Sequence, residues 1–209
     1  MLDSNGFDLW ADGYDKAVGL SEEENTYPFA GYRRVLGIIY AEVMTKPHAS
    51  VLDIGFGTGT LTAKLYENGC TVFGQDFSER MTALAREKMP EAQLYPGDLK
   101  NGLAAPLRGR KYDFIIATYS LHHLSDAEKR VLLPVLLDRL EESGRLLIGD
   151  VAFEDRAQLN ACRAAAGRDW DEEECYFVAD ELKRDFPQLL FTPVSHCAGV
   201  LEITRGRDT

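Results

Sequence analysis

The stretch Val51-Leu52-Asp53-Ile54-Gly55-Phe56-Gly57-Thr58-Gly59 decides the fold of this chain. It joins a short apolar segment, typical of a buried strand, to a turn with three glycines, and the segment 60–65 that follows has the pattern of a helix start. Glycines let the backbone turn sharply and approach a ligand closely. A strand that ends in such a turn presents backbone N–H groups at a helix N-terminus, which suits a nucleotide-like or carboxylate-bearing ligand.

The length and composition of the chain predict a single domain. The 209 residues are 45% hydrophobic, which is enough for a sizeable core. The 34 acidic and 23 basic residues give a formal net charge of −11, and this argues against a general nucleic-acid binder, which needs a basic surface. An acidic surface fits a protein that acts on small, neutral or cationic substrates.

No segment has the pattern of a targeting sequence or a membrane span. Residues 1–6 lack the basic start and apolar run of a signal peptide, and no apolar run approaches the roughly 18 residues that a membrane span requires. The four cysteines occur without C-x-x-C spacing, which indicates reduced thiols and neither a disulfide framework nor a thiolate zinc site. We therefore expect a cytoplasmic protein without membrane contact.

Residues 1–45 precede the first strand and are predicted to form a helical lid on a core that spans 46–209. Trp10 and Tyr14 lie four residues apart, on one aromatic face of the first predicted helix. That face is expected to pack on the core, and its rings also suit the wall of a pocket for a cationic or planar ligand. A second helix is predicted from Pro28 to about Met44.

After the glycine turn, strand patterns alternate with helix patterns over short links, which is the signature of βαβ units and a parallel sheet. Further strands are predicted at 70–76, 93–95, 112–118 and 145–151. Helices are predicted at 78–88, from Ser125 or Asp126 through Leu140 with an end at Gly144, at about 155–166 and at about 178–186.

The remaining segments are predicted to be connections and a terminal strand pair. The segment 101–111 is rich in Gly, Pro and Arg and is expected to cross over as a loop without a full helix. The acidic run 169–174 is expected to be a solvated linker, although its position leaves open a role at the substrate rim. The runs 190–197 and 199–205 predict an antiparallel pair of strands.

The glycine turn does not match the dinucleotide-binding fingerprint G-x-G-x-x-G. Its spacing is G-x-G-x-G, and Thr60 occupies the third glycine position of the fingerprint. Asp53 lies on the strand itself, two residues before Gly55, where a buried carboxylate needs a hydrogen-bond donor. It either caps neighbouring backbone N–H groups or belongs to the ligand site, and two further acids favour the ligand site.

These acids end the second and third predicted strands. Asp76 follows Gly55 by about 20 residues, the offset at which a carboxylate binds ribose hydroxyls in such folds. Phe77, next to it, is suited to lie against an adenine face, and Asp98 to accept from an adenine amino group. Because ligands bind at the carboxyl ends of strands in an open α/β sheet, the acids together predict a nucleoside site.

These residues form a series of motifs: Asp53-x-Gly55-x-Gly57-x-Gly59, Asp76, the Gly97-Asp98 pair, and Tyr112-Asp113-Phe114-Ile115-Ile116 followed by Leu121-His122-His123-Leu124. The series resembles that of the class I S-adenosylmethionine-dependent methyltransferases. The pattern Trp10-Ala11-Asp12-Gly13-Tyr14-Asp15 is similar to that of small stand-alone bacterial members with an N-terminal Trp-Ala-x-x-Tyr-Asp helix. The resemblance extends from about residue 7 to the terminal strand pair.

The resemblance implies an α/β fold in one methyltransferase domain over 1–209. The fold would be a Rossmann-like, doubly wound sheet of seven strands, mostly parallel with an antiparallel last strand, and an N-terminal helical lid. The connection at 101–111 is shorter than the helix that many relatives have there, so the shape of that side is open.

The resemblance also implies a cofactor, S-adenosyl-L-methionine, and the residues that bind it. The three glycines would border its methionine part, Asp76 would hold its ribose, and Phe77 would lie beside its adenine. Asp98 and Leu99 would contact the adenine as well, Thr118 or Tyr119 would lie beside the methionine moiety, and Tyr14 would close over the reacting groups. The residues implied to bind the cofactor are Tyr14, Asp53, Gly55, Gly57, Gly59, Asp76, Phe77, Asp98, Leu99, Thr118 and Tyr119.

His122 and His123 form an adjacent pair after the fourth predicted strand. No H-x-x-x-H spacing and no carboxylate at ligand spacing accompanies them in the sequence, so no metal site is expected. A structural role in packing is favoured, and the alternative is that one of them accepts a proton from the nucleophile. Ser120 lacks the G-x-S-x-G context of a hydrolase nucleophile. The catalytic residues stay open, with Tyr14, His122 and His123 as candidates.

The predicted activity is methyl transfer to a small-molecule O, N or S nucleophile by in-line displacement. Two alternatives stay open: a non-catalytic module that binds S-adenosylmethionine, and an NAD-dependent oxidoreductase, against which Asp53 and Thr60 count. The expected partner is a small methyl acceptor, with no nucleic acid and no membrane, and the protein is expected to be a monomer or homodimer.

Overall fold

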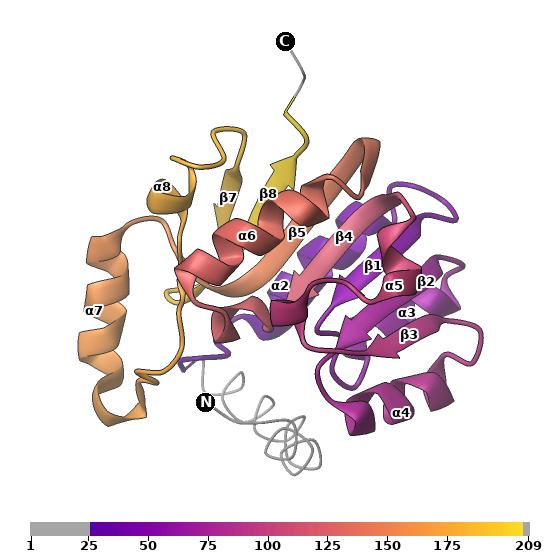
Figure 1. Ribbon diagram of the computed structural model, residues 1–209. Helices are drawn as coiled ribbons and strands as arrows, with labels where there is room; N and C mark the ends of the chain where they lie inside the picture. Colours follow the sequence, from indigo (N-terminus) through magenta and orange to yellow (C-terminus); the bar gives the residue numbers. More distant parts are fainter. Residues whose placement is uncertain (1–25, 207–209) are drawn as a thin grey trace.

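The computed structural model describes residues 26–206, which form one sheet with helices on both of its faces (Figure 1). The predicted helix with Trp10 and Tyr14 lies outside the described residues. The strands are β1 (Ser50–Ile54), β2 (Thr71–Asp76), β3 (Gln93–Pro96), β4 (Tyr112–Thr118), β5 (Leu140–Phe153), β6 (Phe177–Val178), β7 (Leu190–Pro193) and β8 (Ala198–Thr204).

The strand order in the sheet is β3-β2-β1-β4-β5-β8-β7. Neighbouring strands from β3 to β5 are parallel, whereas β8 is antiparallel to both β5 and β7. The predicted mostly parallel sheet with an antiparallel last strand is therefore confirmed. The two-residue strand β6, which pairs with the end of β5, was not predicted and brings the sheet to eight strands.

Over most of the described residues, helices alternate with strands along the chain. They are α2 (Tyr32–Val43), α3 (Thr60–Glu67), α4 (Glu79–Lys88), α5 (Ala105–Arg108), α6 (Asp126–Leu137), α7 (Arg156–Ala166) and α8 (Ala179–Leu182). The second predicted helix of the N-terminal region is thus confirmed as α2, and the segment 101–111 contains one helical turn, α5. Between residues 26 and 206, no helix is long and apolar enough to cross a membrane.

Alternate residues along each strand pack into two separate hydrophobic clusters, one on each face of the sheet. In β1, Val51 packs with the cluster that includes residues of α2 and α3, whereas Leu52 packs with the cluster that includes residues of α5 and α6. Phe114 and Ile115 of β4 divide in the same way. Burial on both faces explains why these strands are almost continuously apolar, and Figure 1 shows α2 and α6 on opposite faces.

One helix boundary differs clearly from the sequence prediction. The helix predicted to continue through Leu140 to Gly144 ends at Leu137, and β5 begins at Leu140. Leu140 fits the helical spacing, but it pairs with Tyr112 of β4, whose N–H donates to the Arg139 carbonyl at 2.8 Å. This strand pairing outweighs local periodicity. The helix predicted at 178–186 is likewise shorter, because α8 ends at Leu182 and a turn follows at 183–185.

Gly149 of β5 determines how closely α2 packs on the sheet. A Cβ atom at this position would lie 2.8 Å from Cδ1 of Ile39 and would also overlap Val35. We expect Gly149→Ala to lower the free energy of unfolding by about 1–3 kcal/mol, because it overpacks this contact. Urea denaturation measures the change. Gly37→Ala is the matched control, because Gly37 lies in α2 itself and a Cβ atom added there has no atom within 4 Å.

The control variant is expected to raise the free energy of unfolding by up to about 1 kcal/mol, since alanine is the better helix former. Equal stability of Gly149→Ala and the wild type would show that α2 does not pack this closely on β5.

Candidate functional site

A cavity of about 390 Å³ lies at the carboxyl ends of β1, β2 and β4, at the point where the strand order reverses. Its volume is in the range of sites for nucleoside-sized ligands. Nine of the residues predicted from sequence line it: Gly55, Gly57, Asp76, Phe77, Asp98, Leu99, Thr118, Tyr119 and His123. Residues from segments far apart in the chain thus meet in one cavity.

The glycine turn after β1 has a left-handed backbone at all three glycines, with φ of +72° at Gly55, +55° at Gly57 and +76° at Gly59. A Cβ atom on Gly55 would lie 2.8 Å from Oγ of Ser120, so the turn and the loop after β4 are in close contact. A Cβ atom on Gly57 would have no neighbour within 4 Å, because this residue faces the cavity. Gly59 is the N-cap of α3 and does not line the cavity.

Asp76 is fixed in the cavity wall by backbone donors. Its Oδ2 accepts from the Gly57 N–H at 2.8 Å, and its Oδ1 accepts from the Ser78 N–H at 2.9 Å. These bonds orient the carboxylate at the end of β2. Since each carboxylate oxygen can accept more than one hydrogen bond, the group can also bind a pair of ligand hydroxyls.

The end of β3 and the residue after β2 supply another part of the wall. Asp98 caps a short 3₁₀ turn, Leu99–Asn101, by accepting from the Lys100 N–H at 2.9 Å. Leu99 and the partly exposed Phe77 present apolar surface to the same cavity. This combination of an aromatic ring, an aliphatic side chain and a carboxylate suits a heteroaromatic base.

Asp53 lies beneath the glycine turn and not in the cavity wall. It is 1% exposed, and its Oδ2 accepts a short hydrogen bond from the Thr62 hydroxyl, which joins β1 to α3. Its Oδ1 has no hydrogen-bond partner within residues 26–206. Burial raises the pKa of Asp53 to about 7, the Thr62 hydrogen bond opposes this, and the charge of Asp76 adds to it.

Aromatic side chains form the wall on the side of α2. The Tyr119 ring lies 5.0 Å from that of Tyr32 and 5.4 Å from that of Phe29, measured between ring centroids. Tyr119 has a φ of +49°, which is uncommon outside glycine, and its N–H donates to the Gly149 carbonyl at 2.8 Å. Tyr32 was missed in the sequence analysis, because the periodicity of α2 predicts a helix but does not show which end meets the cavity.

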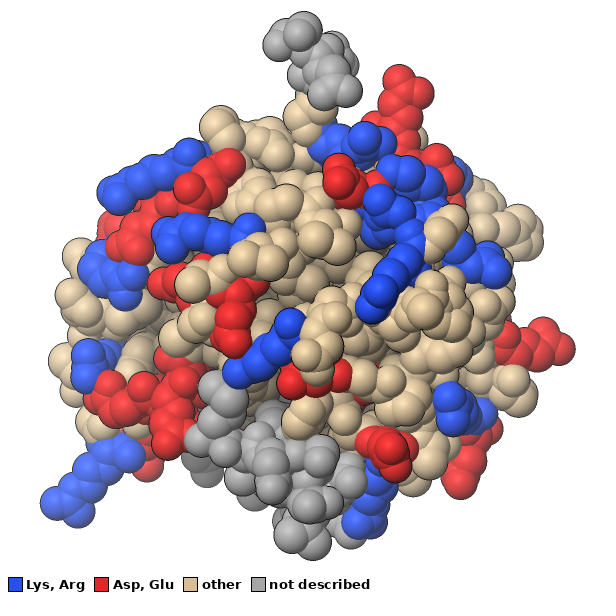
Figure 2. Space-filling view, viewed as in Figure 1, with Lys and Arg blue, Asp and Glu red and all other residues tan. Residues whose placement is uncertain are grey.

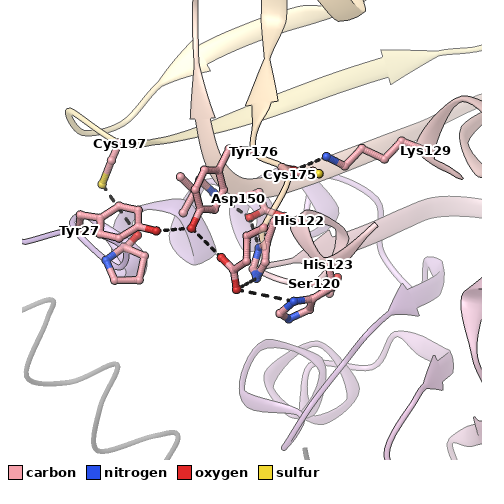
Figure 3. A network of polar contacts seen from close by, with 12 residues as sticks. Tyr27, Ser120, His122, His123, Lys129, Asp150, Cys175, Tyr176 and Cys197 are labelled. Carbon is pink, nitrogen blue, oxygen red and sulfur yellow. Dashed lines mark hydrogen bonds and ion pairs between the residues drawn. The ribbon is translucent and has the colours of Figure 1, made fainter. Parts of the chain in front are cut away.

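The histidine pair lies in a 3₁₀ turn, Leu121–His123, between β4 and α6. His122 is buried, and its Nδ1 lies 2.6 Å from Oδ1 of Asp150, whereas His123 reaches the cavity wall (Figure 3). Glu174 comes close to both rings, with Oε1 3.5 Å from Nε2 of His122 and 3.6 Å from Nδ1 of His123.

The two histidines have opposite electrostatic environments. Burial opposes the charging of His122, but the charge of Asp150, the hydrogen bond to it and the charge of Glu174 together raise the pKa of His122. Burial and the neighbouring His122 lower the pKa of His123 to about 3. His123 is therefore neutral and weakly basic at neutral pH.

Asp150 and Glu174 were both missed as site residues in the sequence analysis. Glu174 belongs to the acidic run that was expected to be a solvated linker, with a role at the substrate rim left open. Trp170 of that run stacks on Tyr27, with ring centroids 5.1 Å apart, and brings the segment against the core. A tryptophan within an acidic run was the available signal. Asp150 is fully buried in the otherwise apolar second half of β5, residues 146–153, which also marks it as functional or structural.

Comparisons with known proteins give one consistent result. A family model described as a methyltransferase domain matches residues 51–144. An uncharacterized methyltransferase of Geobacillus thermodenitrificans is 37% identical over 182 residues, which is 86% of this chain and 79% of that protein.

Two solved structures have a similar fold. The DhpI–SAH complex has a TM-score of 0.73 at 16% identity and covers 98% of this chain and 96% of that one. Magnesium protoporphyrin IX methyltransferase from Synechocystis, solved with bound SAH, has a TM-score of 0.66 at 20% identity and covers 84% of each chain.

The raised pKa of Asp53 predicts a pH-dependent stability. Between about pH 4 and pH 7 the folded protein retains a proton on Asp53 that the unfolded chain has released, so this contribution to stability falls as the pH rises. Asp53→Asn does not titrate and retains an acceptor for Thr62. We expect the stability of the wild type, relative to this variant, to fall by about 2–3 kcal/mol between about pH 5 and pH 8.

Urea denaturation of both proteins at the two pH values measures this difference. A stability difference that does not change with pH would contradict the raised pKa of Asp53.

Proposed function

The chain belongs to the family of class I S-adenosylmethionine-dependent methyltransferases, and we propose that it binds this cofactor in the cavity at the carboxyl edge of its sheet and methylates a small-molecule O, N or S nucleophile. The observation that carries the proposal is the convergence of the glycine turn, Asp76 and Asp98 on one cavity.

The cavity residues fit the parts of S-adenosylmethionine. The Asp76 carboxylate, oriented by the N–H groups of Gly57 and Ser78, would accept hydrogen bonds from the two ribose hydroxyls. Phe77 would lie against the adenine, and Asp98 would accept from its amino group.

The glycine turn and the loop after β4 fit the methionine part. The open space beside Gly57 would be filled by any Cβ there, so this glycine leaves room for the ligand. Thr118 and Tyr119 line the cavity beside the turn and would contact the methionine moiety. Asp53 would act from below, by holding α3 and the turn in place, without direct contact.

When bound, the cofactor supplies a methyl group that its sulfonium already activates, and the acceptor's lone pair forms the new bond as the carbon–sulfur bond breaks. The protein then has to align donor and acceptor and exclude water. Tyr32 and Tyr119 form an apolar wall suited to that task. His123 lies at the wall, but with a pKa of about 3 it is a poor general base, so alignment carries the larger share of catalysis.

A small-molecule acceptor agrees with the charge distribution. On the face in Figure 2, basic and acidic side chains are interspersed, apart from a local group of basic ones at the upper right. With a formal net charge of −11, this favours a metabolite over a nucleic acid. The expectation that Tyr14 closes over the reacting groups stays a prediction, since Tyr14 lies outside the described residues.

Calorimetric titration tests the cofactor site. S-adenosylmethionine and its demethylated product should bind to the wild type, and NAD should not. Asp76→Ala should weaken binding about 10- to 100-fold, because hydrogen bonds to a charged acceptor are lost. Glu67→Ala, at the exposed far end of α3, is the control and should bind like the wild type.

Binding of NAD alone would overturn the proposal in favour of an oxidoreductase. A screen for methyl transfer to small metabolites, read as release of the demethylated product, then separates the enzyme from a non-catalytic binding module. The module is supported if the cofactor binds normally and no acceptor in the screen is methylated.

A further inference from the structure

We propose that His122, His123 and Glu174 form a binding site for a transition-metal dication such as Zn²⁺ at the wall of the cavity. Nε2 of His122, Nδ1 of His123 and Oε1 of Glu174 all lie within 4.8 Å of one another. No metal site was expected from the sequence, because no carboxylate accompanies the histidines at ligand spacing. The fold supplies that carboxylate from a segment about 50 residues further along the chain.

The distances within the cluster fit metal ligands better than hydrogen bonds. Oε1 of Glu174 lies 3.5 Å from the His122 nitrogen and 3.6 Å from the His123 nitrogen, both longer than the 2.7–3.2 Å of an ordinary N–H···O bond. Two ligands bound tetrahedrally to Zn²⁺ at about 2.0 Å lie roughly 3.3 Å apart. The ligand atoms lie within 4.8 Å of one another, so the part-exposed His123 ring would turn toward His122 when all three bind one ion.

Outer partners orient two of the three ligands. Asp150 accepts from Nδ1 of His122 at 2.6 Å, so that Nε2, on the side of Glu174, is the nitrogen left to bind a metal ion in place of a proton. The Tyr176 hydroxyl donates to Oε2 of Glu174 at 2.7 Å, and Oε1 is directed at the histidines. Carboxylate–histidine pairs and hydrogen-bonded carboxylates of this kind are the usual surroundings of metal ligands.

The backbone also fixes the cluster. The Cys175 N–H donates to the carbonyl of His122 at 2.8 Å, which holds the segment with Glu174 beside the 3₁₀ turn. A main-chain hydrogen bond thus joins His122 to the residue that follows Glu174. The arrangement therefore does not depend on long, exposed side chains.

The charges around the cluster favour a dication. Asp150 is fully buried and Glu174 is 21% exposed, so two carboxylates meet at His122 with little water to screen them. Lys129 is the basic side chain that acts on His122, but its ammonium group donates to the Cys175 carbonyl and lies 3.6 Å from Asp126. Its charge is therefore partly compensated, and the two carboxylates balance a bound dication.

Two imidazoles and one carboxylate determine which metal ions can bind and what a bound ion can do. Nitrogen-rich sites of this type prefer Zn²⁺, Co²⁺ or Fe²⁺ to Mg²⁺ or Ca²⁺, and three protein ligands leave a position open. His123 lines the cavity, so that position is expected on the cavity side. If the proposed function is right, a thiol or hydroxyl acceptor that binds there would lose its proton more readily, because the metal stabilises the anion.

Metal titration of the untagged protein, stripped with a chelator and dialysed, tests the site. Co²⁺ binding is followed by visible absorbance, and Zn²⁺ binding by competition with a chromophoric chelator. We expect one ion per chain. Glu174→Gln and His123→Ala should each weaken Zn²⁺ binding at least about tenfold, since changes to outer partners alone commonly do so.

The controls are other potential metal ligands of the chain. His48→Ala and His196→Ala change exposed histidines outside the cluster, and Cys175→Ser removes the nearest thiol; all three should bind Zn²⁺ like the wild type. Thermal melting in the presence of a chelator checks that each variant is folded. Loss of binding in a control, or unchanged binding in Glu174→Gln, would overturn the site.

The same proteins are titrated with S-adenosylmethionine. Metal binding without cofactor binding would reject the proposed function and keep the metal site. Cofactor binding without metal binding would do the reverse, and it would identify the cluster as a metal-free histidine–carboxylate network.

Discussion

The hydrogen bond from the Gly57 N–H to the Asp76 carboxylate is the interaction on which the cavity depends, because it ties the turn after β1 to the end of β2. The Gly55 N–H adds a second link at 2.7 Å, to the carbonyl of the residue before Asp76. On the other side, the Ser120 hydroxyl donates to the Ile54 carbonyl at 2.7 Å and joins the loop after β4. Three loops thus form one hydrogen-bonded rim, and a side chain on Gly55 would break it.

The same constraint explains the buried acid beneath the rim. Asp53 holds α3 through Thr62, so the helix that begins at Gly59 keeps its N-terminus at the cavity. An apolar residue in place of Asp53 would leave the Thr62 hydroxyl buried without that partner, which costs about 1–3 kcal/mol. Burial at this position is the main cause of the raised pKa of Asp53.

Sequence patterns predicted the half of the site that consecutive βαβ units build, because there each functional residue ends a strand with a recognisable pattern. Asp76 and Asp98 were located by this rule, and the structure places both in the cavity wall. The same rule did not locate Glu174 and Tyr32, since their positions follow from packing between distant segments. The end of α6 was predicted wrongly for a related reason. Leu140 satisfies the helical spacing, but it pairs with Tyr112 of β4 and therefore belongs to β5.

The two halves of the cavity therefore differ in origin and, under the proposed function, in task. The backbone between residues 51 and 124 forms the side that would bind the methyl donor. Any relative that uses S-adenosylmethionine needs the same shape there. Tyr32 of α2 lines the other side, and the segment around Glu174, which Trp170 holds in place by stacking on Tyr27, adjoins it at His123. These contacts are independent of the glycine turn, so this side can change without loss of the cofactor site. Selectivity for the acceptor then resides in residues that no local motif marks.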